Sequence, residues 1–470
     1  MSNQPKRPVM VLLTSHWISM LGAALVTLAG FCWIFALPIH IRGHVSNPYM
    51  GLLTFIALPL VFFAGLALIP IGIALAKRRV IGEFNAIPDR RTAWRKAAIF
   101  FGVMTVVNLV IASQVSFRAM EHMETVQFCG LTCHVMKPEF TAHTAPPHQE
   151  VSCATCHIVP GATGWVKAKM AGTHQLIGVI FNTYTRPIES AMENNRLVAS
   201  ADTCERCHAR EKFVGPRLRI HTKFQDDEAN TRTETVLMMQ VGGGKQGGIH
   251  GAHLGPGVQI SYGAADKKRH TIPWVEYRNT GTNTTRTYLA SDADASGLAA
   301  LPKFEMQCVD CHNRIGHSFD TPEGAVDRAL AGGEIPLTLP LVRKTGVELV
   351  QAAYKSDADA EQAIPAGVAS FYSSKYPDVA GQRAADVRAA GQALLAVYRR
   401  NVFPDLKVTW GTYPDNLGHV DFPGCFRCHD GAHAASGGAS ITQDCNTCHQ
   451  ALAMEETSPE ILKTLGVPVP

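Results

Sequence analysis

The sequence predicts a mainly α-helical protein with little regular structure, in which three N-terminal transmembrane helices precede a cysteine- and histidine-rich domain. Two observations support this fold class. Hydrophobic residues make up 46% and charged residues only 17% of the 470 residues, and the long apolar runs lie near the N-terminus. Beyond these runs, a pair of cysteines is followed at once by a histidine six times. A chain of this length has room for two or more domains.

Three apolar runs, at 18–38, 50–76 and 97–117, contain no Lys, Arg, Asp or Glu. A helix needs about 20 such residues to cross a bilayer, and the first two runs satisfy this most clearly. The third run contains Asn108 and has a polar end. All three are apolar on every side rather than along one stripe, which favours membrane spans over a buried core hairpin.

Basic residues around these runs predict their orientation. Lys6 and Arg7 precede the first run, and seven Lys and Arg residues lie in 77–96, whereas the 39–49 loop carries only Arg42. The positive-inside rule then puts the N-terminus and the 77–96 loop in the cytoplasm. With three spans, every residue after about 117 lies outside. The first run begins too late and is too long for a secretory signal.

The six cysteine–histidine runs predict six haem c groups. Five are C-x-x-C-H, the attachment signature of c-type haem, and the first has one extra residue. Two thiols bond the porphyrin and the adjacent histidine ligates the iron. The attachment cysteines are Cys129, Cys133, Cys153, Cys156, Cys204, Cys207, Cys308, Cys311, Cys425, Cys428, Cys445 and Cys448. The motif histidines are His134, His157, His208, His312, His429 and His449.

Other uses of paired cysteines do not explain these runs. A zinc site, a disulfide or a redox C-x-x-C does not require a histidine directly after the second cysteine. The thirteenth thiol, Cys32, lies in an apolar run. Thioether haem attachment takes place on the outer side of the bacterial inner membrane, which agrees with the orientation predicted from charge. We therefore expect an inner-membrane protein with a cytoplasmic N-terminus and a periplasmic haem domain.

Each iron has a second axial position, and a second histidine there gives a six-coordinate haem suited to electron transfer. Histidines close to a motif, or in the Gly-rich segment 247–255, are the preferred second ligands. These candidates are His148, His250, His253, His317, His419 and His433, with His221 as a weaker one. Met136 stands two residues after the first motif and is an alternative ligand there. The remaining histidines of this region, His122, His143, His174 and His270, are not expected to ligate iron.

The chain divides into a membrane anchor at 1–117, a three-haem region at 118–215 and a second three-haem region at 216–470. In the last region, 274–277 and 285–289 flank a Gly-containing turn and predict a β-hairpin. Thr321 and Pro322 predict a helix start, and apolar spacing predicts a helix over 380–400. Lys245 is followed by Gln rather than Ser or Thr, so the Gly-rich segment 241–248 is not a phosphate loop.

Residues 115–215 resemble the NapC/NirT family of membrane-anchored multihaem cytochromes. The resemblance is carried by Cys-His-Val-Met-Lys-Pro-Glu-Phe, by Pro-Pro-His ahead of Cys-Ala-Thr-Cys-His, and by Asp-Thr-Cys-Glu-Arg-Cys-His. The later motifs resemble the longer inner-membrane cytochromes of metal-respiring bacteria. The resemblance implies oxidation of membrane quinol, either menaquinol or ubiquinol, and delivery of electrons to a periplasmic acceptor.

The resemblance also implies particular site residues. In one branch of the family the methionine of Cys-His-x-Met ligates the first haem, which points to Met136. A lysine past the second motif lies at the quinol pocket, and Lys167 or Lys169 matches it. His174 is nearest to the position where the family has an acidic residue. Typical members have one anchor helix and four or five haems, fewer than expected here.

The expected function is quinol oxidation with transfer of electrons to periplasmic c-type cytochromes or a reductase. The alternative is a non-catalytic membrane anchor and electron-transfer subunit of a larger respiratory complex. A terminal reductase with an open haem is a third reading, which the surplus of histidines disfavours. The formal net charge of +4 does not indicate a nucleic-acid partner, because no basic stripe with interleaved aromatics accompanies it and haem propionates would reverse its sign.

Overall fold

The structure is a computed structural model that describes residues 13–14, 16–41, 56–82, 90–132, 134–145, 147–212, 215–243, 247–293 and 297–467. The chain forms two compact units, Met1–Phe128 and Cys129–Pro470. The division at 117/118 and 215/216 stays a prediction. Lys6, Arg7, Arg42 and Lys245, on which parts of the sequence argument rest, lie outside the described residues.

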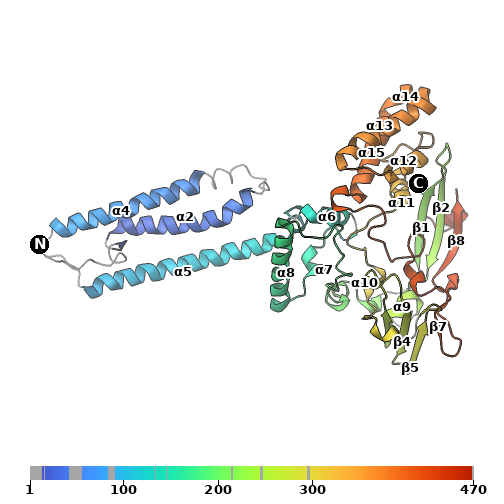
Figure 1. Cartoon of the computed structure of the whole chain (residues 1–470), viewed down its shortest axis with the longest axis horizontal. Helices are drawn as coiled ribbons and strands as arrows, with labels where there is room; N and C mark the ends of the chain where they lie inside the picture. Colours follow the sequence, from blue (N-terminus) through green and yellow to red (C-terminus); the bar gives the residue numbers. More distant parts are fainter. Residues whose placement is uncertain are drawn as a thin grey trace. The chain divides into compact units, whose positions relative to one another are not determined.

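The first unit contains three long helices, α2 (Trp17–Ile41), α4 (Leu58–Gly82) and α5 (Arg90–Met123) (Figure 1). Two segments in the described residues are long and apolar enough to cross a membrane, Leu58–Ala76 and Trp94–Met123. These correspond to the second and third apolar runs. The apolar segment of the first run, Trp17–Cys32, is shorter. Two membrane-length helices are therefore present, and a three-span anchor remains a prediction.

Helices α2 and α4 pack closely because small residues face each other. A Cβ atom added at Gly22 would lie 2.7 Å from the Gly65 carbonyl oxygen, and one at Gly65 would lie 2.9 Å from that of Gly22. Glycine therefore permits the backbones to approach, as is common between helices in membranes. Large apolar side chains such as Leu60, Phe63 and Leu109 are exposed on the helix surfaces, where lipid would cover them.

The second unit begins with short helical segments that carry the cysteine–histidine motifs. In three motifs the histidine N–H donates to the carbonyl of the first cysteine: His208 to Cys204 (2.8 Å), His312 to Cys308 (2.8 Å) and His429 to Cys425 (3.0 Å). A single turn of this kind brings both thiols and the imidazole close together. The segments are η2 (Phe128–Thr132), η3 (His134–Met136), α6 (Lys137–His143), α7 (Cys153–His157), η4 (Ser200–Asp202), η5 (Cys204–Arg206), η6 (Arg210–Lys212), α10 (Cys308–Cys311), η9 (Gly424–Arg427) and η10 (Cys445–Thr447).

Two antiparallel sheets lie between and after these segments. The first has the order β1 (Arg217–Phe224), β2 (Arg232–Met239), β8 (His449–Glu456), and Figure 1 shows these strands side by side. The second has the order β6 (Lys303–Glu305), β3 (Val258–Gly263), β4 (Trp274–Asn279), β5 (Thr284–Leu289), β7 (Ala434–Ala435). The pairing of β4 with β5 confirms the predicted hairpin. The protein is mostly helical as expected, but the prediction of little regular structure missed the first sheet and the strands β3, β6 and β7 of the second.

A helical insert separates the fourth and fifth motifs. It comprises α11 (Pro322–Ala331), α12 (Val342–Gln351), α13 (Asp357–Lys375), α14 (Pro377–Gln382) and α15 (Ala384–Asn401). Its core is built on fully buried side chains, among them Leu330, Ile364 and Leu394. Thr321 caps α11 by accepting a hydrogen bond from the Gly324 N–H, as predicted. The helix predicted at 380–400 is divided, because Arg383 is not helical (φ −124°, ψ 33°).

The insert is fastened to the first sheet by polar contacts. The Asn230 amide donates to the carbonyls of Leu337 and Leu339, at 3.0 and 2.8 Å. Arg343 pairs with Asp327 at 3.0 Å and with Asp226 at 2.8 Å. The remaining elements are α8 (Ala162–Ile180), α9 (Gly248–Leu254), η7 (Leu298–Ala300), η8 (Pro404–Leu406) and α16 (Glu460–Thr464).

Candidate haem sites

Thiols of consecutive motifs lie near one another. The Cys153 thiol lies close enough to Cys129 of the first motif for this cysteine to lower its pKa, and Cys308 of the fourth motif likewise lowers the pKa of Cys204 of the third. The second and third motifs are close enough for Cys156 to interact electrostatically with Cys204. The same holds for Cys311 with Cys425 and for Cys448 with Cys425. The six motifs therefore follow one another in space in their sequence order.

Each of the last five motif histidines faces a second histidine from elsewhere in the chain. The ring centroids of these pairs are 5.8 to 6.2 Å apart. The pairs are His157 with His317, His208 with His148, His312 with His250, His429 with His253, and His449 with His419. Five of the second-ligand candidates thus lie opposite a motif histidine.

The separation within the pairs suits an iron bound between two imidazoles. Metal–nitrogen bonds of about 2 Å on opposite sides of one ion hold the two ring centroids about 6 Å apart. Direct packing of the rings does not require this spacing to recur five times. In the described part of the chain, no cluster of three or more His, Cys, Asp or Glu side chains could hold a bare metal ion.

Backbone carbonyls orient several of these rings. The carbonyl of Glu139 lies 3.0 Å from Nδ1 of His317, and the carbonyl of Ile249 lies 2.7 Å from Nδ1 of His253. Nδ1 of His429 lies 2.7 Å from the Thr442 carbonyl. A carbonyl at Nδ1 accepts its proton and leaves Nε2 available as the ligand nitrogen, the usual second contact of a metal-bound histidine.

Burial keeps these rings in the neutral form that ligates metal. Desolvation lowers the pKa of His317 to about 4 and also lowers the pKa of His157, His253 and His312. A neutral imidazole has the free nitrogen lone pair that an iron ligand needs. The environment therefore favours coordination even before a cofactor is attached.

The first motif lies partly outside the described residues, since Cys133 is not described and neither is the side chain of His134. Met136 is half-buried. His143, which was not expected to be a ligand, is buried and its ring centroid lies 5.8 Å from that of His317. Nδ1 of His143 lies 3.1 Å from the Gly316 carbonyl, while its buried Nε2 has no hydrogen-bond partner. His143 therefore belongs with the candidate ligands near the second motif.

Two predicted ligands occupy other surroundings. His433 is buried, with Nδ1 2.9 Å from a carboxylate oxygen of Asp430 and Nε2 2.7 Å from the Ile272 carbonyl. Both of its nitrogens are thus occupied by hydrogen bonds. His221 lies on β1 opposite Thr235 of β2 and forms none of the five pairs. His433 was predicted to be a ligand because it closely follows the fifth motif, but its ring is not in one of the five histidine pairs.

The comparisons with known proteins agree with this arrangement. Residues 91–237 match the N-terminal region of the NapC/NirT cytochrome c family. The chain is also 36% identical over 463 residues to cytochrome c-type protein ImcH of Geobacter sulfurreducens, covering 94% of this chain and 89% of the relative. The chain belongs to the NapC/NirT cytochrome c family. No solved structure matches it. It is therefore a membrane-type multihaem c-type cytochrome of electron transfer, and its cofactor is haem c.

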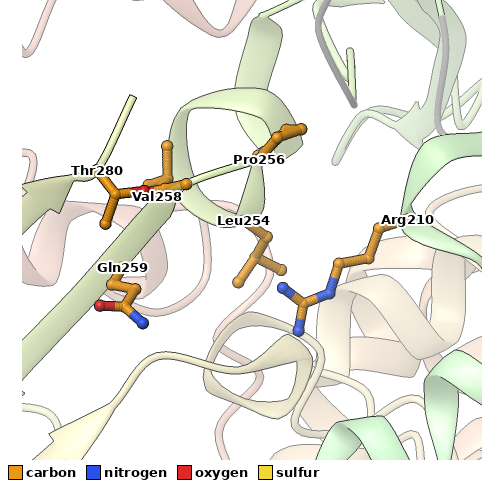
Figure 2. A pocket seen from close by; sticks show the side chains of 8 residues that line it. Arg210, Leu254, Pro256, Val258, Gln259 and Thr280 are labelled. Carbon is orange, nitrogen blue, oxygen red and sulfur yellow. The ribbon is translucent and has the colours of Figure 1, made fainter. Parts of the chain in front are cut away.

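Two cavities adjoin paired histidines of this NapC/NirT cytochrome. One, of about 340 Å³, is lined by Arg210, Leu254, Val258 and Gln259 and lies next to His253 in the chain. Figure 2 shows the Arg210 guanidinium directed toward Leu254, and this guanidinium forms an ion pair with Glu205 at 2.5 Å. A second cavity, of about 120 Å³, is lined by residues that include His312, Arg314 and Asp415. The residues present thus fit haem c by thiol spacing, imidazole geometry and available space.

A buried charge network holds the fourth motif. Asp310, which stands between the two cysteines of this motif, accepts hydrogen bonds from Arg269 (3.0 Å), from the Tyr262 hydroxyl and from the Gln307 N–H (2.7 Å). The Asp310 and Arg269 side chains are only 4% and 10% exposed. Burial and the Asp310 carboxylate raise the pKa of Tyr262. This network fixes the turn that presents Cys308 and Cys311.

The three residues expected at a quinol site all lie on α8. Lys167 and His174 are exposed, and Lys169 is half-buried with its Nζ atom 5.6 Å from the centroid of the Trp165 ring. Lys167 and His174 are seven residues apart and therefore share one side of the helix, whereas Lys169 lies on another. The structure thus gathers these residues on one element without forming a closed pocket around them in the described part of the chain.

Proposed function

We propose that this protein is a six-haem cytochrome that oxidises membrane quinol and passes electrons to a periplasmic acceptor. The observation that carries the proposal is the spatial order of the six motifs, in which cysteines of each motif lie near those of the following one. An electron-transfer chain needs such an order, because neighbouring redox centres must be close. A protein with isolated haem sites would not need it.

The short connection between α5 and the first motif would keep this motif close to the membrane. Cys129 stands only six positions after Met123, where the apolar helix α5 ends. Even fully extended, six residues span no more than about 20 Å. Electrons from a membrane donor would therefore enter at the first or second motif and leave near Cys445 and Cys448, the last cysteines of the series.

When bound, haem c supplies the one-electron redox centres, and the chain's own residues do the remaining work. The paired imidazoles would ligate the haem iron, and His134 or Met136 would do so at the first motif. Quinol releases two protons when it is oxidised, so basic groups near its hydroxyls assist the reaction. Lys167, Lys169 and His174 begin ten residues after His157 of the second motif and are the proposed basic groups.

Orientation and partners follow from the same proposal. The N-terminus would be cytoplasmic and the second unit periplasmic, on the side of the inner membrane where haem c is attached. The donors would be menaquinol or ubiquinol, and the acceptors periplasmic c-type cytochromes or a reductase. Six covalent haems are proposed, one for each motif.

Reconstitution of the full chain in liposomes tests quinol oxidation. Adding a reduced quinone should reduce the haems, followed by their α-band absorbance, and the Lys167→Ala/Lys169→Ala variant should slow this reduction about tenfold or more. Lys375→Ala, an exposed change on α13, is the matched control. Haem stoichiometry from the intact mass tests the number six.

The alternative function predicts a different result in the same liposomes. A non-catalytic anchor and electron-transfer subunit would keep all haems oxidised in the presence of quinol, while a soluble low-potential reductant would reduce all of them. That combination would refute quinol oxidation and leave electron transfer intact. A high-spin haem in the unmodified protein would instead favour a terminal reductase.

A further inference from the structure

Helix α8 (Ala162–Ile180) exposes an unusual set of side chains for a helix of a water-facing domain. Val166, Met170, Ile177 and Ile180 are 48%, 71%, 50% and 66% exposed. At 100° per residue, these four positions fall within one 80° sector of the helix surface. An apolar stripe therefore runs along the outside of α8, interrupted by Thr173, whose hydroxyl donates to the Lys169 carbonyl at 2.9 Å.

On the side opposite the stripe, α8 packs against the protein near its two ends. Gly164 is buried, and a Cβ atom there would clash with the Val159 carbonyl. Val179, near the other end of the helix, packs against the cluster formed by Val135, Phe403 and Tyr413. The helix is thus fixed to the second unit by one side, and its apolar stripe is directed away from this unit's core.

Basic side chains border the stripe on both sides. Lys167 and His174 lie beyond one edge of the sector and Lys169 lies beyond the other, and α8 contains no Asp or Glu. An apolar stripe bordered by lysines suits the surface of an anionic bilayer, because lysine stems cover apolar surface while their ammonium groups reach lipid phosphates. By contrast, the insert helix α13 exposes charged residues such as Asp359 and Glu361.

We propose that α8 lies in the headgroup region of the membrane, with its apolar stripe inserted between anionic lipids. Connectivity supports this position. The Cys153 thiol lies close to Cys129, Cys129 follows α5 by six residues, and α8 begins nine residues after Cys153. Contact with lipid would hold the first two motifs against the bilayer. The inference does not depend on quinol oxidation, since an electron-transfer subunit without a quinol site could also use it.

Thiol accessibility in the full-length protein tests the inference. In a Cys32→Ser background, Met170→Cys would be compared with Gln175→Cys, an exposed position on another side of α8. The protein is placed in liposomes of phosphatidylethanolamine and phosphatidylglycerol and treated with a membrane-impermeant maleimide. We expect M170C to react about tenfold more slowly than Q175C, because its thiol lies in the apolar layer. Equal rates at the two positions would overturn the inference.

A second measurement identifies what covers the stripe. Diazirine-labelled phosphatidylglycerol in the same liposomes should form adducts on peptides containing residues 162–181. Adding Lys167→Glu and Lys169→Glu should reduce these adducts and speed the M170C reaction. Slow M170C labelling without lipid adducts would show that a protein or a second copy covers α8, which would also overturn the inference.

Discussion

The imidazole rings of His419 and His449 lie 6.2 Å apart between centroids and are inclined by only 20°. The His419 ring also stacks on the ring of Phe426, with centroids 4.3 Å apart and an angle of 10° between the ring planes. The aromatic contact limits the rotation of His419 and keeps it opposite the motif histidine. This pair is the last in the series of motifs and so defines the end from which electrons would leave.

Replacing His419 by alanine should remove the second axial ligand from the haem of the sixth motif. That haem would then become five-coordinate, because no second histidine ring contacts His449 in the described residues apart from His419. Electron paramagnetic resonance of the oxidised protein should show a new high-spin signal. His221→Ala is the control and should leave all haems low-spin. A fully low-spin His419→Ala protein would contradict the proposed pair.

Replacing His433 by alanine should leave axial ligation unchanged and lower stability. Its two ring nitrogens are occupied by Asp430 and the Ile272 carbonyl, and the residue is 2% exposed. Loss of a buried polar side chain that leaves partners unsatisfied costs about 1–3 kcal/mol. The thermal midpoint in detergent should fall while the resonance spectrum stays that of the wild type. A high-spin signal in this variant would show that His433 is a ligand after all.

The stability of the fourth motif should depend on the buried ion pair between Asp310 and Arg269. Removing one partner from a buried pair leaves the other charge uncompensated and costs about 3–5 kcal/mol. Asp310→Ala should therefore lower the thermal midpoint and the fraction of chains whose mass includes every haem. Lys267→Ala removes a pair with Glu189 that is 72% and 37% exposed, so it should cost less than about 1 kcal/mol. Equal effects of both changes would argue against the network.

Local and non-local features differed in how well the sequence predicted them. The cysteine–histidine motifs are local, so their positions and their use in haem attachment could be predicted directly, whereas their short helical turns were not predicted. The second histidines are not local: His317 follows the fourth motif but faces His157 of the second, and His148 precedes the second motif but faces His208 of the third. Such pairings depend on how distant segments fold together, so sequence spacing could rank candidates but not assign them.

The first sheet was missed even though β1 carries a usable signal. In Arg217–Phe224, apolar or uncharged residues alternate with Arg217, Arg219, His221 and Lys223, the period-two pattern of a strand with one face toward solvent. The burial of Asn230 and Arg343 at the insert could not be predicted in this way. Asn230 bonds to the Leu337 carbonyl and Arg343 to Asp226, each more than 100 residues away, and only the folded structure brings these residues together.

The helical insert should lose stability in strongly alkaline solution because of buried tyrosines. Tyr398 is 2% exposed and its ring centroid lies 5.3 Å from that of Tyr354. Burial raises the pKa of Tyr398 to about 12, from an ordinary value of 10.0. The unfolded chain would ionise near pH 10, whereas the folded chain would keep its proton until about pH 12. Stability is therefore complete below about pH 10 and is lost progressively as the pH rises through this window.

Tyr398→Phe should keep the ring packing while removing the ionisable hydroxyl. The helical circular dichroism of the variant should melt at the wild-type temperature at pH 8 and at a higher temperature than the wild type at pH 11. Tyr372→Phe provides the comparison, because the Tyr372 hydroxyl donates a hydrogen bond to the Pro340 carbonyl at 2.9 Å. That variant should already be less stable at pH 8, by about 1 kcal/mol. If Tyr398→Phe melts with the wild type at both pH values, the ionisation of Tyr398 does not limit the stability of the insert.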